Sequence, residues 1–326
     1  MQKISKQCIF IARKESFFTM ILNILLLIIG FIMLVRGADY FVDGSVALAQ
    51  RLRIPAIVIG LTVVAMGTSA PETAISIFSV LKNSDSILIG NIIGSNIANI
   101  LLILGITVLI SDLHIQKNTL VYEIPFVGFI TLLLCGVGLY CGIISRLFAF
   151  VLLGLFVMFL IYLYIISKSE KTSEIEVKQI GKLKTTLYLI GGLILLILGS
   201  NLAVDSAVKL AGDFGVSERI IGITVVAFGT SVPELVTCIV SALKKQADIA
   251  VGNIVGSNIF NILFVLGITG VISPILFKPE FLFDGIFALA SVLMLMLFGY
   301  NKNRVLKRWA SMCFLATYAL YILLVV

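Results

Sequence analysis

The chain has 326 residues, of which 60% are hydrophobic and 13% are charged, and its formal net charge is +7. Soluble domains carry about twice this share of charged residues, whereas several apolar runs here reach the roughly 20 residues that cross a bilayer. The composition excludes a soluble protein and predicts an all-α membrane protein that crosses the bilayer many times.

The apolar runs predict ten transmembrane helices, with residues 1–19 as an N-terminal extension and Met20 as an alternative start. A first half, 20–166, holds five helices, and a charged link, 167–184, connects it to a second half, 185–326, with five more. The predicted helices cover residues 18–36 (with an amphipathic continuation to 49), 56–81, 86–111, 119–141, 146–166, 185–211, 219–243, 248–272, 281–300 and 308–326.

Two strings occur in both halves with a constant offset of 162 residues. Residues 61–72 read LTVVAMGTSAPE and residues 223–234 read ITVVAFGTSVPE, so nine of the twelve positions are identical. Residues 90–105 and 252–267 match at twelve of sixteen positions. A duplication kept for stability alone would preserve apolar and small residues, so paired glutamates and asparagines favour a functional site.

The halves are expected to have opposite orientations in the membrane. Equivalent helices are five positions apart in the chain, and because five is odd, the second half must enter the bilayer from the other side. This pattern predicts two inverted-topology repeats of five helices each, an architecture of secondary transporters with a site near the bilayer midplane.

The first string places a helix break beside a carboxylate. Pro71 has no N–H, so the carbonyl of Gly67 loses its helical partner, and Pro233 does the same to Gly229. We expect Thr68 or Ser69 to cap the helix that restarts at Pro71. Broken backbone is tolerated at membrane depth only where it lines a cavity or is buried in protein.

The second string adds more oxygen on one helical face. Asn91, Gly94, Ser95, Ala98 and Asn99 recur at helical spacing. The second half repeats this face with Asn253, Gly256, Ser257, Phe260 and Asn261.

The glycines of these faces indicate close helix packing, while the serines and asparagines are expected to face the site. The site would hold carboxylate, hydroxyl, amide and carbonyl oxygens with neither Cys nor His. Such a set suits Ca²⁺ or Na⁺ and argues against zinc, copper and iron.

These paired strings resemble the two α-repeat signatures of the cation/calcium exchanger superfamily, in particular its prokaryotic sodium/calcium exchangers. The resemblance covers nearly the whole chain from Met20 and implies four central cation sites, gated by sliding of the first and sixth helices. It implies an electrogenic exchange of three Na⁺ for one Ca²⁺. The implied ligands are Glu72 and Glu234, with oxygens from Thr68, Ser69, Thr230, Ser231, Ser95, Ser257, Asn99 and Asn261 and the carbonyls of Ala65 and Ala227.

One departure concerns the charge of the site. Relatives often have Asp at one or both of the positions held here by Asn99 and Asn261, so this site has only the two formal charges of Glu72 and Glu234. This argues against a potassium-dependent exchanger and leaves the Na⁺ stoichiometry open. Outside the site, Asp43 and Asp205 recur with the same offset and are expected near the cavity mouths.

Three other function classes remain as alternatives. A proton/calcium exchanger could use the same two glutamates, and a channel would need one continuous pore. A membrane enzyme is disfavoured because no nucleophile–base pair or phosphate loop is present. The five cysteines form no CxxC pattern, and no cofactor is expected beyond the transported Ca²⁺ and Na⁺.

Charge also predicts orientation. Fifteen Lys and Arg residues lie on the side of the 167–184 link and nine on the side of both termini. The positive-inside rule therefore places the link in the cytoplasm and both termini outside, in a multi-pass inner (plasma) membrane protein. No basic face has interleaved aromatic residues, so we expect no nucleic-acid partner, and a monomer surrounded by lipid is the expected working unit.

Overall fold

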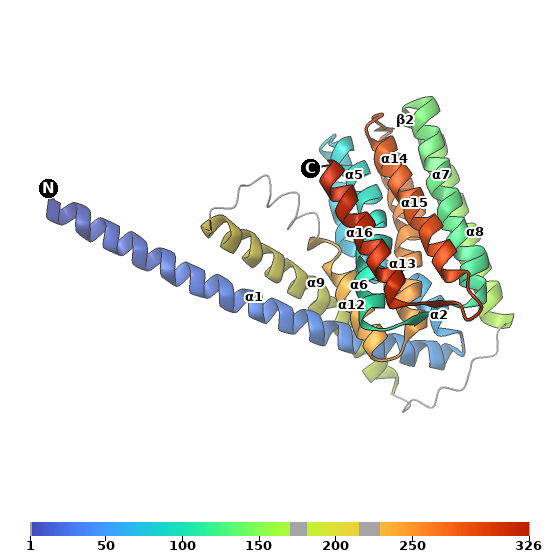
Figure 1. Ribbon diagram of the computed structural model, residues 1–326, viewed down its shortest axis with the longest axis horizontal. Coiled ribbons are helices and arrows are strands. Elements are labelled where there is room, and N and C mark those ends of the chain that lie inside the picture. Colours follow the sequence, from blue (N-terminus) through green and yellow to red (C-terminus); the bar gives the residue numbers. More distant parts are fainter. Residues whose placement is uncertain (1, 170–180, 215–228, 326) are drawn as a thin grey trace.

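The computed structural model describes residues 2–169, 181–214 and 229–325, and side chains from Thr19 onward. The described chain is almost entirely helical (Figure 1). It holds eight helices long and apolar enough to cross a membrane, or nine if the bent pair Ala56–Thr68 and Ala70–Leu81 is one span. The predicted helix over 219–243 lies partly outside the described residues, and only its second part, α12 (Val232–Leu243), is described.

Most predicted helices end within a few residues of the observed ones. The first helix was predicted too short, since α1 runs without interruption from Gln2 to Leu52. The charged link is also shorter than predicted, because α8 continues to Ser169 and α9 begins at Lys182. The remaining helical elements are α2 (Ala56–Ile59), η1 (Gly60–Val64), α3 (Ala65–Thr68), α4 (Ala70–Leu81), α5 (Asp85–Ile97), η2 (Ala98–Leu104), α6 (Gly105–Ile110), η3 (Thr119–Glu123), α7 (Ile124–Cys141), α13 (Ala247–Phe260), η5 (Asn261–Val265), α14 (Leu266–Ile272), α15 (Phe281–Gly299) and α16 (Arg308–Val325), where η denotes a π-helical segment.

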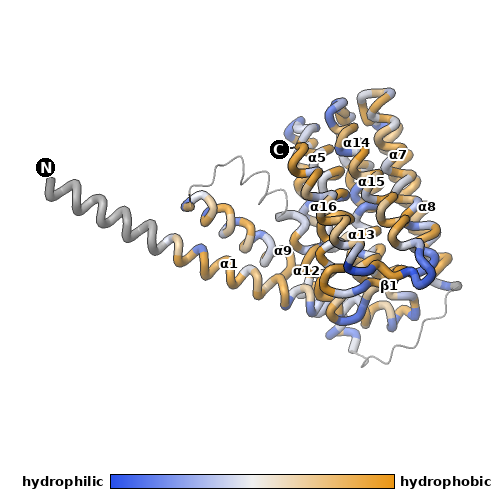
Figure 2. The backbone as a smooth tube through the Cα atoms, in the orientation of Figure 1, coloured by the Kyte–Doolittle hydropathy of each residue, from blue (hydrophilic) through white to orange (hydrophobic). Residues whose placement is uncertain are grey.

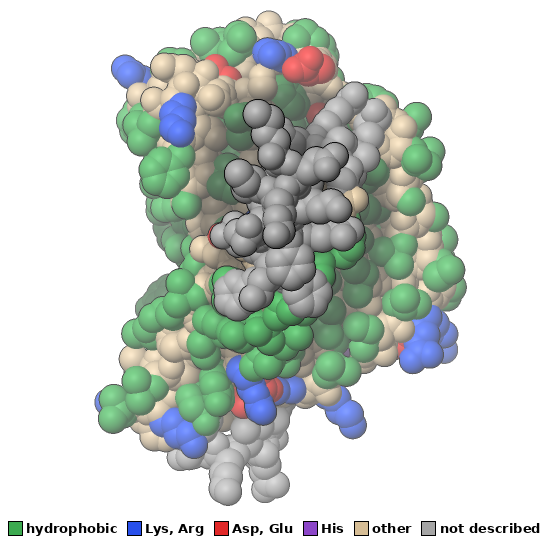
Figure 3. Space-filling view, turned by 90° about the vertical axis from the view of Figure 1, so that its left-hand side faces the viewer, with side chains coloured by type: hydrophobic (Ala, Val, Ile, Leu, Met, Phe, Trp, Pro, Cys, Tyr) green, Lys and Arg blue, Asp and Glu red, His purple; other side chains and the backbone are tan. Residues whose placement is uncertain are grey.

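Two helices lie at the centre of the bundle. About four-fifths of the most apolar window is buried in Asp85–Ile110 (78%) and in Ala247–Ile272 (83%), against 22–33% in the other full-length spans. The outer helices are mostly hydrophobic along their length (Figure 2), and many of their large apolar side chains are exposed. On the face in Figure 3, most Lys and Arg side chains lie toward two opposite ends with hydrophobic surface between them, as a lipid-embedded surface requires.

α1 and α9 form a long pair beside the bundle (Figure 1). Gly30 lies against Gly199 and Gly37 against Gly192, so the two helices run antiparallel. A Cβ added at Gly30 would lie 2.9 Å from the carbonyl oxygen of Gly199, and one at Gly37 would lie 2.9 Å from that of Gly192. These glycines therefore allow the two backbones to touch, as in other small-residue helix interfaces.

Two short antiparallel strand pairs join the connections between helices. β1 (Leu113–His114) pairs with β4 (Val305–Leu306), and β2 (Ile143–Ile144) pairs with β3 (Ile275–Leu276). Adding 162 to the positions of β1 gives β3, and adding it to β2 gives β4. The two pairs are therefore equivalent, which matches the repeat in the sequence.

Candidate cation site

The site lies where a helix is broken in each half. α3 ends at Thr68 and α4 begins at Ala70, with a bend of 50° between the two segments. Ser69 occupies the break with φ −82° and ψ 14°, and Ser231 has nearly the same conformation, φ −90° and ψ 6°. A proline in the first turn follows each break, as the sequence predicts.

The predicted capping role of Thr68 and Ser69 is wrong, because no side chain caps α4. Their hydroxyl groups instead reach the other half of the chain. The Thr68 hydroxyl donates to Asn253 Oδ1 at 3.0 Å. Ser69 Oγ lies 2.9 Å from both Glu234 Oε1 and Ser257 Oγ. A buried hydroxyl needs a hydrogen-bond partner, which is an amide oxygen for Thr68 and a carboxylate for Ser69.

The contact between Ser69 and Glu234 has an equivalent. Ser231 donates its hydroxyl to Glu72 Oε1 at 3.1 Å. Each glutamate is therefore held by the serine that precedes the broken helix of the opposite half. These crossed bonds bring the two predicted carboxylates into one buried site.

Four asparagines form a second crossed pair. Asn99 Nδ2 donates to Asn258 Oδ1 at 3.0 Å, and Asn261 Nδ2 donates to Asn96 Oδ1 at 3.2 Å. The π-helical segments η2 and η5 begin at or beside the two site asparagines, Asn99 and Asn261. Such segments are frequent at functional sites.

Asn96 and Asn258 were missed as site residues, although the sequence holds their signal. Both are asparagines within an apolar run, and the 162-residue offset relates them. Asn96 and Asn258 accept hydrogen bonds from the amide nitrogens of Asn261 and Asn99. The amide oxygens of Asn99 and Asn261 therefore point away from these two flanking asparagines.

Five oxygens of the predicted ligand residues are buried and have no hydrogen-bond partner. They are Glu72 Oε2, Glu234 Oε2, Asn99 Oδ1 and Asn261 Oδ1, on residues that are at most 2% exposed, and Thr230 Oγ1. Buried polar atoms in proteins are almost always satisfied, so these oxygens point to a ligand. The described residues contain no group of three or more His, Cys, Asp or Glu that could hold a metal. Carboxylate, amide and hydroxyl oxygens instead fit a hard cation such as Ca²⁺ or Na⁺.

The other predicted ligands lie around this set. Ser95 is buried on α5, and Thr230 lies in the turn before α12. Ala65 is fully buried, and its carbonyl accepts the N–H of Ser69 at 3.0 Å. Ala227 lies outside the described residues.

The prolines were predicted to free one carbonyl in each half, and the structure shows what binds one of them. The carbonyl of Gly229 accepts a hydrogen bond from the Ser200 hydroxyl on α9 at 3.0 Å. Ala38 stands at the equivalent position of the first half and has no hydroxyl to do the same.

Comparison with known proteins identifies the family. A family model described as sodium/calcium exchanger protein matches residues 22–165 and 184–326, which are the two halves of the repeat. The chain belongs to the sodium/calcium exchanger family. This agrees with the resemblance seen in its paired strings and makes it a membrane transporter.

Several relatives cover most of this exchanger-family chain. The putative antiporter CaxA of Alkalimonas amylolytica is 38% identical over 78% of this chain and 82% of its own length. The sodium/calcium exchanger MaX1 of Methanosarcina acetivorans is 28% identical over 92% of this chain and 97% of its own. A structure of the sodium-calcium exchanger NCX_Mj, soaked with zero Na⁺ and Ca²⁺, superposes with a TM-score of 0.82 at 32% identity, covering 94% of this chain and 99% of the other.

Proposed function

We propose that this exchanger-family protein uses a Na⁺ gradient to transport Ca²⁺ in the opposite direction at the Glu72–Glu234 site. The observation that carries the proposal is the set of five unpartnered, buried oxygens, two from carboxylates, two from amides and one from the Thr230 hydroxyl. Thr68, Ser69, Thr230, Ser231, Ser95, Ser257 and the carbonyls of Ala65 and Ala227 complete the proposed ligand set.

The charge of this site explains how two ions can share it. Two ionised glutamates give −2, which one Ca²⁺ neutralises, and Na⁺ can replace Ca²⁺ at the same oxygens. Because two bare carboxylates are costly to bury, the site is stabilised when it is occupied, which couples the release of one ion to the binding of the other. With three Na⁺ the loaded site would carry +1, so we propose an electrogenic exchange.

We further propose ten transmembrane helices in two inverted repeats, with the site between them. The antiparallel contact of α1 and α9, the first long helix of each half, supports the inversion. The crossed bonds of Ser69 with Glu234 and of Ser231 with Glu72 also support it, because the 162-residue offset converts one bond into the other.

An experiment with purified protein in liposomes tests the driving ion. Vesicles loaded with Na⁺ and diluted into Na⁺-free buffer should take up ⁴⁵Ca²⁺. A proton gradient with the same concentration ratio across the membrane should drive little uptake. An inside-negative potential should slow this uptake, because each Ca²⁺ that enters is exchanged for three outgoing Na⁺ and net positive charge leaves. Uptake that followed the pH gradient and ignored Na⁺ would instead assign the protein to proton/calcium exchange through the same two glutamates.

A further inference from the structure

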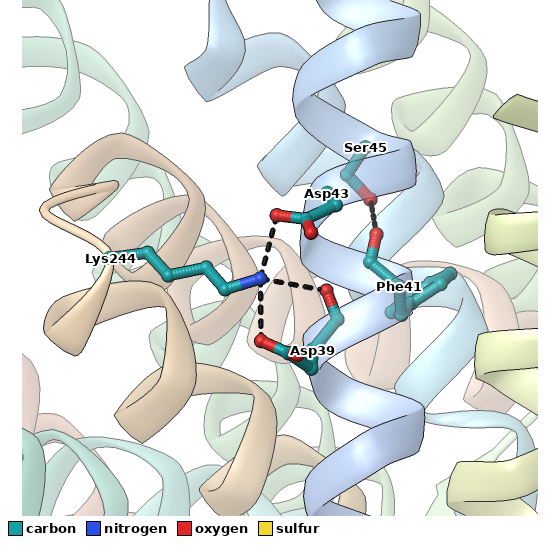
Figure 4. Close-up of polar contacts among 5 residues, drawn as sticks. All are labelled: Asp39, Phe41, Asp43, Ser45 and Lys244. Carbon is teal, nitrogen blue, oxygen red and sulfur yellow. Dashed lines mark hydrogen bonds and ion pairs between the residues drawn. The ribbon is translucent and has the colours of Figure 1, made fainter. Parts of the chain in front are cut away.

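A lysine at the end of α12 bridges two aspartates on α1 (Figure 4). Lys244 Nζ lies 2.6 Å from Asp39 Oδ1 and 2.6 Å from Asp43 Oδ1, and it also donates to the carbonyl oxygen of Asp39 at 2.9 Å. Asp39 and Asp43 are one helical turn apart, so their carboxylates share one face of α1. These three residues are named the α1 latch below.

The α1 latch lies beside an apolar contact between the same elements. Phe41 and Val42 of α1 are buried in one cluster with Val232 and Val240 of α12. The charged side chains keep 26–44% of their surface exposed, so water and salt reach the latch but do not surround it. The latch therefore adds a modest electrostatic contribution to the packing of α1 on the core.

The equivalent bridge between the halves is absent from the described part of the chain, although two of its three residues are kept. The 162-residue offset relates Lys244 to Lys82 and Asp43 to Asp205, whereas Asp39 corresponds to Asn201. Lys82 and Asp205 are both exposed, and neither forms an ion pair within the described part of the chain. The strand pairs and the crossed bonds of the site occur in both halves, so the symmetry is broken at the outer contacts of α1 and α9.

We infer that Lys244, Asp39 and Asp43 are positioning residues that hold the α1–α9 pair in one of two arrangements on the core. The two halves are alike in sequence and oppositely oriented. A second arrangement therefore exists in which each half adopts the conformation that the other half has here. In that arrangement Lys82, at the end of α4, bridges Asp205 on α9. Alternating access by rocking of one unit against another about a fixed site requires two such arrangements. This inference rests on the proposed transport function.

The two latches differ by one carboxylate. Asp39 provides a second carboxylate for Lys244, whereas Asn201 provides only a neutral amide for Lys82. The arrangement seen here is therefore favoured electrostatically over the exchanged one. Asn201→Asp should remove that difference, and Asp39→Asn combined with Asn201→Asp should reverse it without changing the net charge.

Distances between spin labels test this inference in the full chain. With the native cysteines replaced, labels at Val35→Cys on α1 and Leu147→Cys on α8, both exposed, report the position of α1 relative to the core. We expect two distances, and the ratio of their populations should change about two- to fivefold for each carboxylate removed or added. The double variant Asp39→Asn/Asn201→Asp should reverse the ratio.

Matched controls separate this effect from unfolding and from a general loss of charge. Glu280→Gln removes a carboxylate from the exposed pair with Lys278, 3.7 Å apart, and should leave the ratio unchanged. Labels at Leu147→Cys and Leu323→Cys, both in the bundle, should keep one distance in every variant. Lys244→Met removes the bridging ammonium and should shift the ratio toward the second arrangement. If this variant does not fold, the exposed substitution Asn201→Asp decides the question alone.

An unchanged ratio in Lys244→Met, Asn201→Asp and the double variant would overturn the latch. Ca²⁺ uptake, measured on the same proteins, keeps this failure distinct from failure of the transport proposal. Shifted populations in the variants, with no Ca²⁺ uptake by the unmodified protein, would leave the latch in place and remove the proposal of Na⁺-driven Ca²⁺ transport. Normal uptake with unshifted populations would remove only the latch.

Discussion

At the scale of single residues, the site depends on how each polar side chain is oriented. Glu72 and Glu234 each use one carboxylate oxygen to accept from a serine of the other half, and each leaves the second oxygen unpartnered. The amide nitrogen of Asn99 likewise donates to Asn258, and that of Asn261 donates to Asn96. Both amides leave their oxygens unpartnered. Every one of the four side chains is thus fixed at one end and available at the other.

The flanking asparagines are expected to control Ca²⁺ affinity without binding Ca²⁺ themselves. Asn96→Ala or Asn258→Ala removes the acceptor for one site amide, whose oxygen is then no longer held toward the site. The loss of one buried hydrogen bond is about 1 kcal/mol, so the half-saturating Ca²⁺ concentration for uptake should rise roughly fivefold. Asn96→Ala also removes a donor to the Asn258 carbonyl, so its effect should be at least as large as that of Asn258→Ala. An unchanged concentration in both variants would show that these asparagines do not position the site.

At the scale of elements, the sequence predicts the helices well where apolar runs end in charged or turn-forming residues. Asn83 and Lys245, which follow the two broken helices, both have positive φ (53° and 59°) and end their helices at equivalent positions. α1 begins earlier than predicted, because residues 2–17 are polar and basic and favour an extension over a membrane helix. Its predicted continuation past Arg36 and Asp39 to residue 49 ends three residues before Leu52, and packing on α9 and the bridge to Lys244 support the helix there.

The sequence predicts the residues of the proposed site but not the bonds between them. Repetition of the two strings points to the glutamates and asparagines, because no packing requirement explains them in an apolar run. The string alone could not show that the Ser69 hydroxyl crosses to Glu234 instead of capping its own helix. That choice depends on a residue 165 positions away, which local sequence rules do not include.

The contact between α1 and α9 gives a prediction at this scale. Gly192→Ala places a methyl group 2.6 Å from the backbone nitrogen of Phe41 and should destabilise the protein by about 1–3 kcal/mol. Gly191→Ala is the matched control, because nothing lies within 4 Å of its added Cβ, and it should be neutral or stabilising by up to about 1 kcal/mol. Thermal unfolding in detergent measures both variants, and equal melting temperatures would contradict the close helix contact.

At the scale of the whole molecule, one offset of 162 residues relates the strands, the crossed bonds of the site and the glycines of the α1–α9 pair. In the proposed arrangement, two oppositely oriented halves supply equivalent ligands to a shared centre. The exception to this relation is informative, because among the described residues Lys244 bridges to α1 whereas its equivalent Lys82 forms no ion pair with α9. A carrier that opens to alternate sides needs a symmetric centre and outer contacts that are used in turn.

The orientation in the membrane follows from the charge bias and is directly testable. In a cysteine-free background, Lys278→Cys in the connection between α14 and α15 should react with a membrane-impermeant maleimide in intact cells. Lys168→Cys, in the last turn of α8, should react only after permeabilisation, because the 167–184 link is expected in the cytoplasm. The opposite labelling pattern would show that the chain is inserted the other way.

The central claim, that Glu72 and Glu234 together form one Ca²⁺ site, is tested most directly by Na⁺-driven ⁴⁵Ca²⁺ uptake into proteoliposomes containing single Glu→Gln variants. Glu123→Gln is the matched control, because Glu123 is also a buried glutamate but lies at the end of η3, where it accepts from the Tyr162 hydroxyl on the outer helix α8. Removing one charge of a buried, cation-paired set costs about 3–5 kcal/mol. Uptake by Glu72→Gln and by Glu234→Gln should therefore fall at least about a hundredfold, while Glu123→Gln keeps wild-type uptake. Wild-type uptake in either site variant would contradict the account.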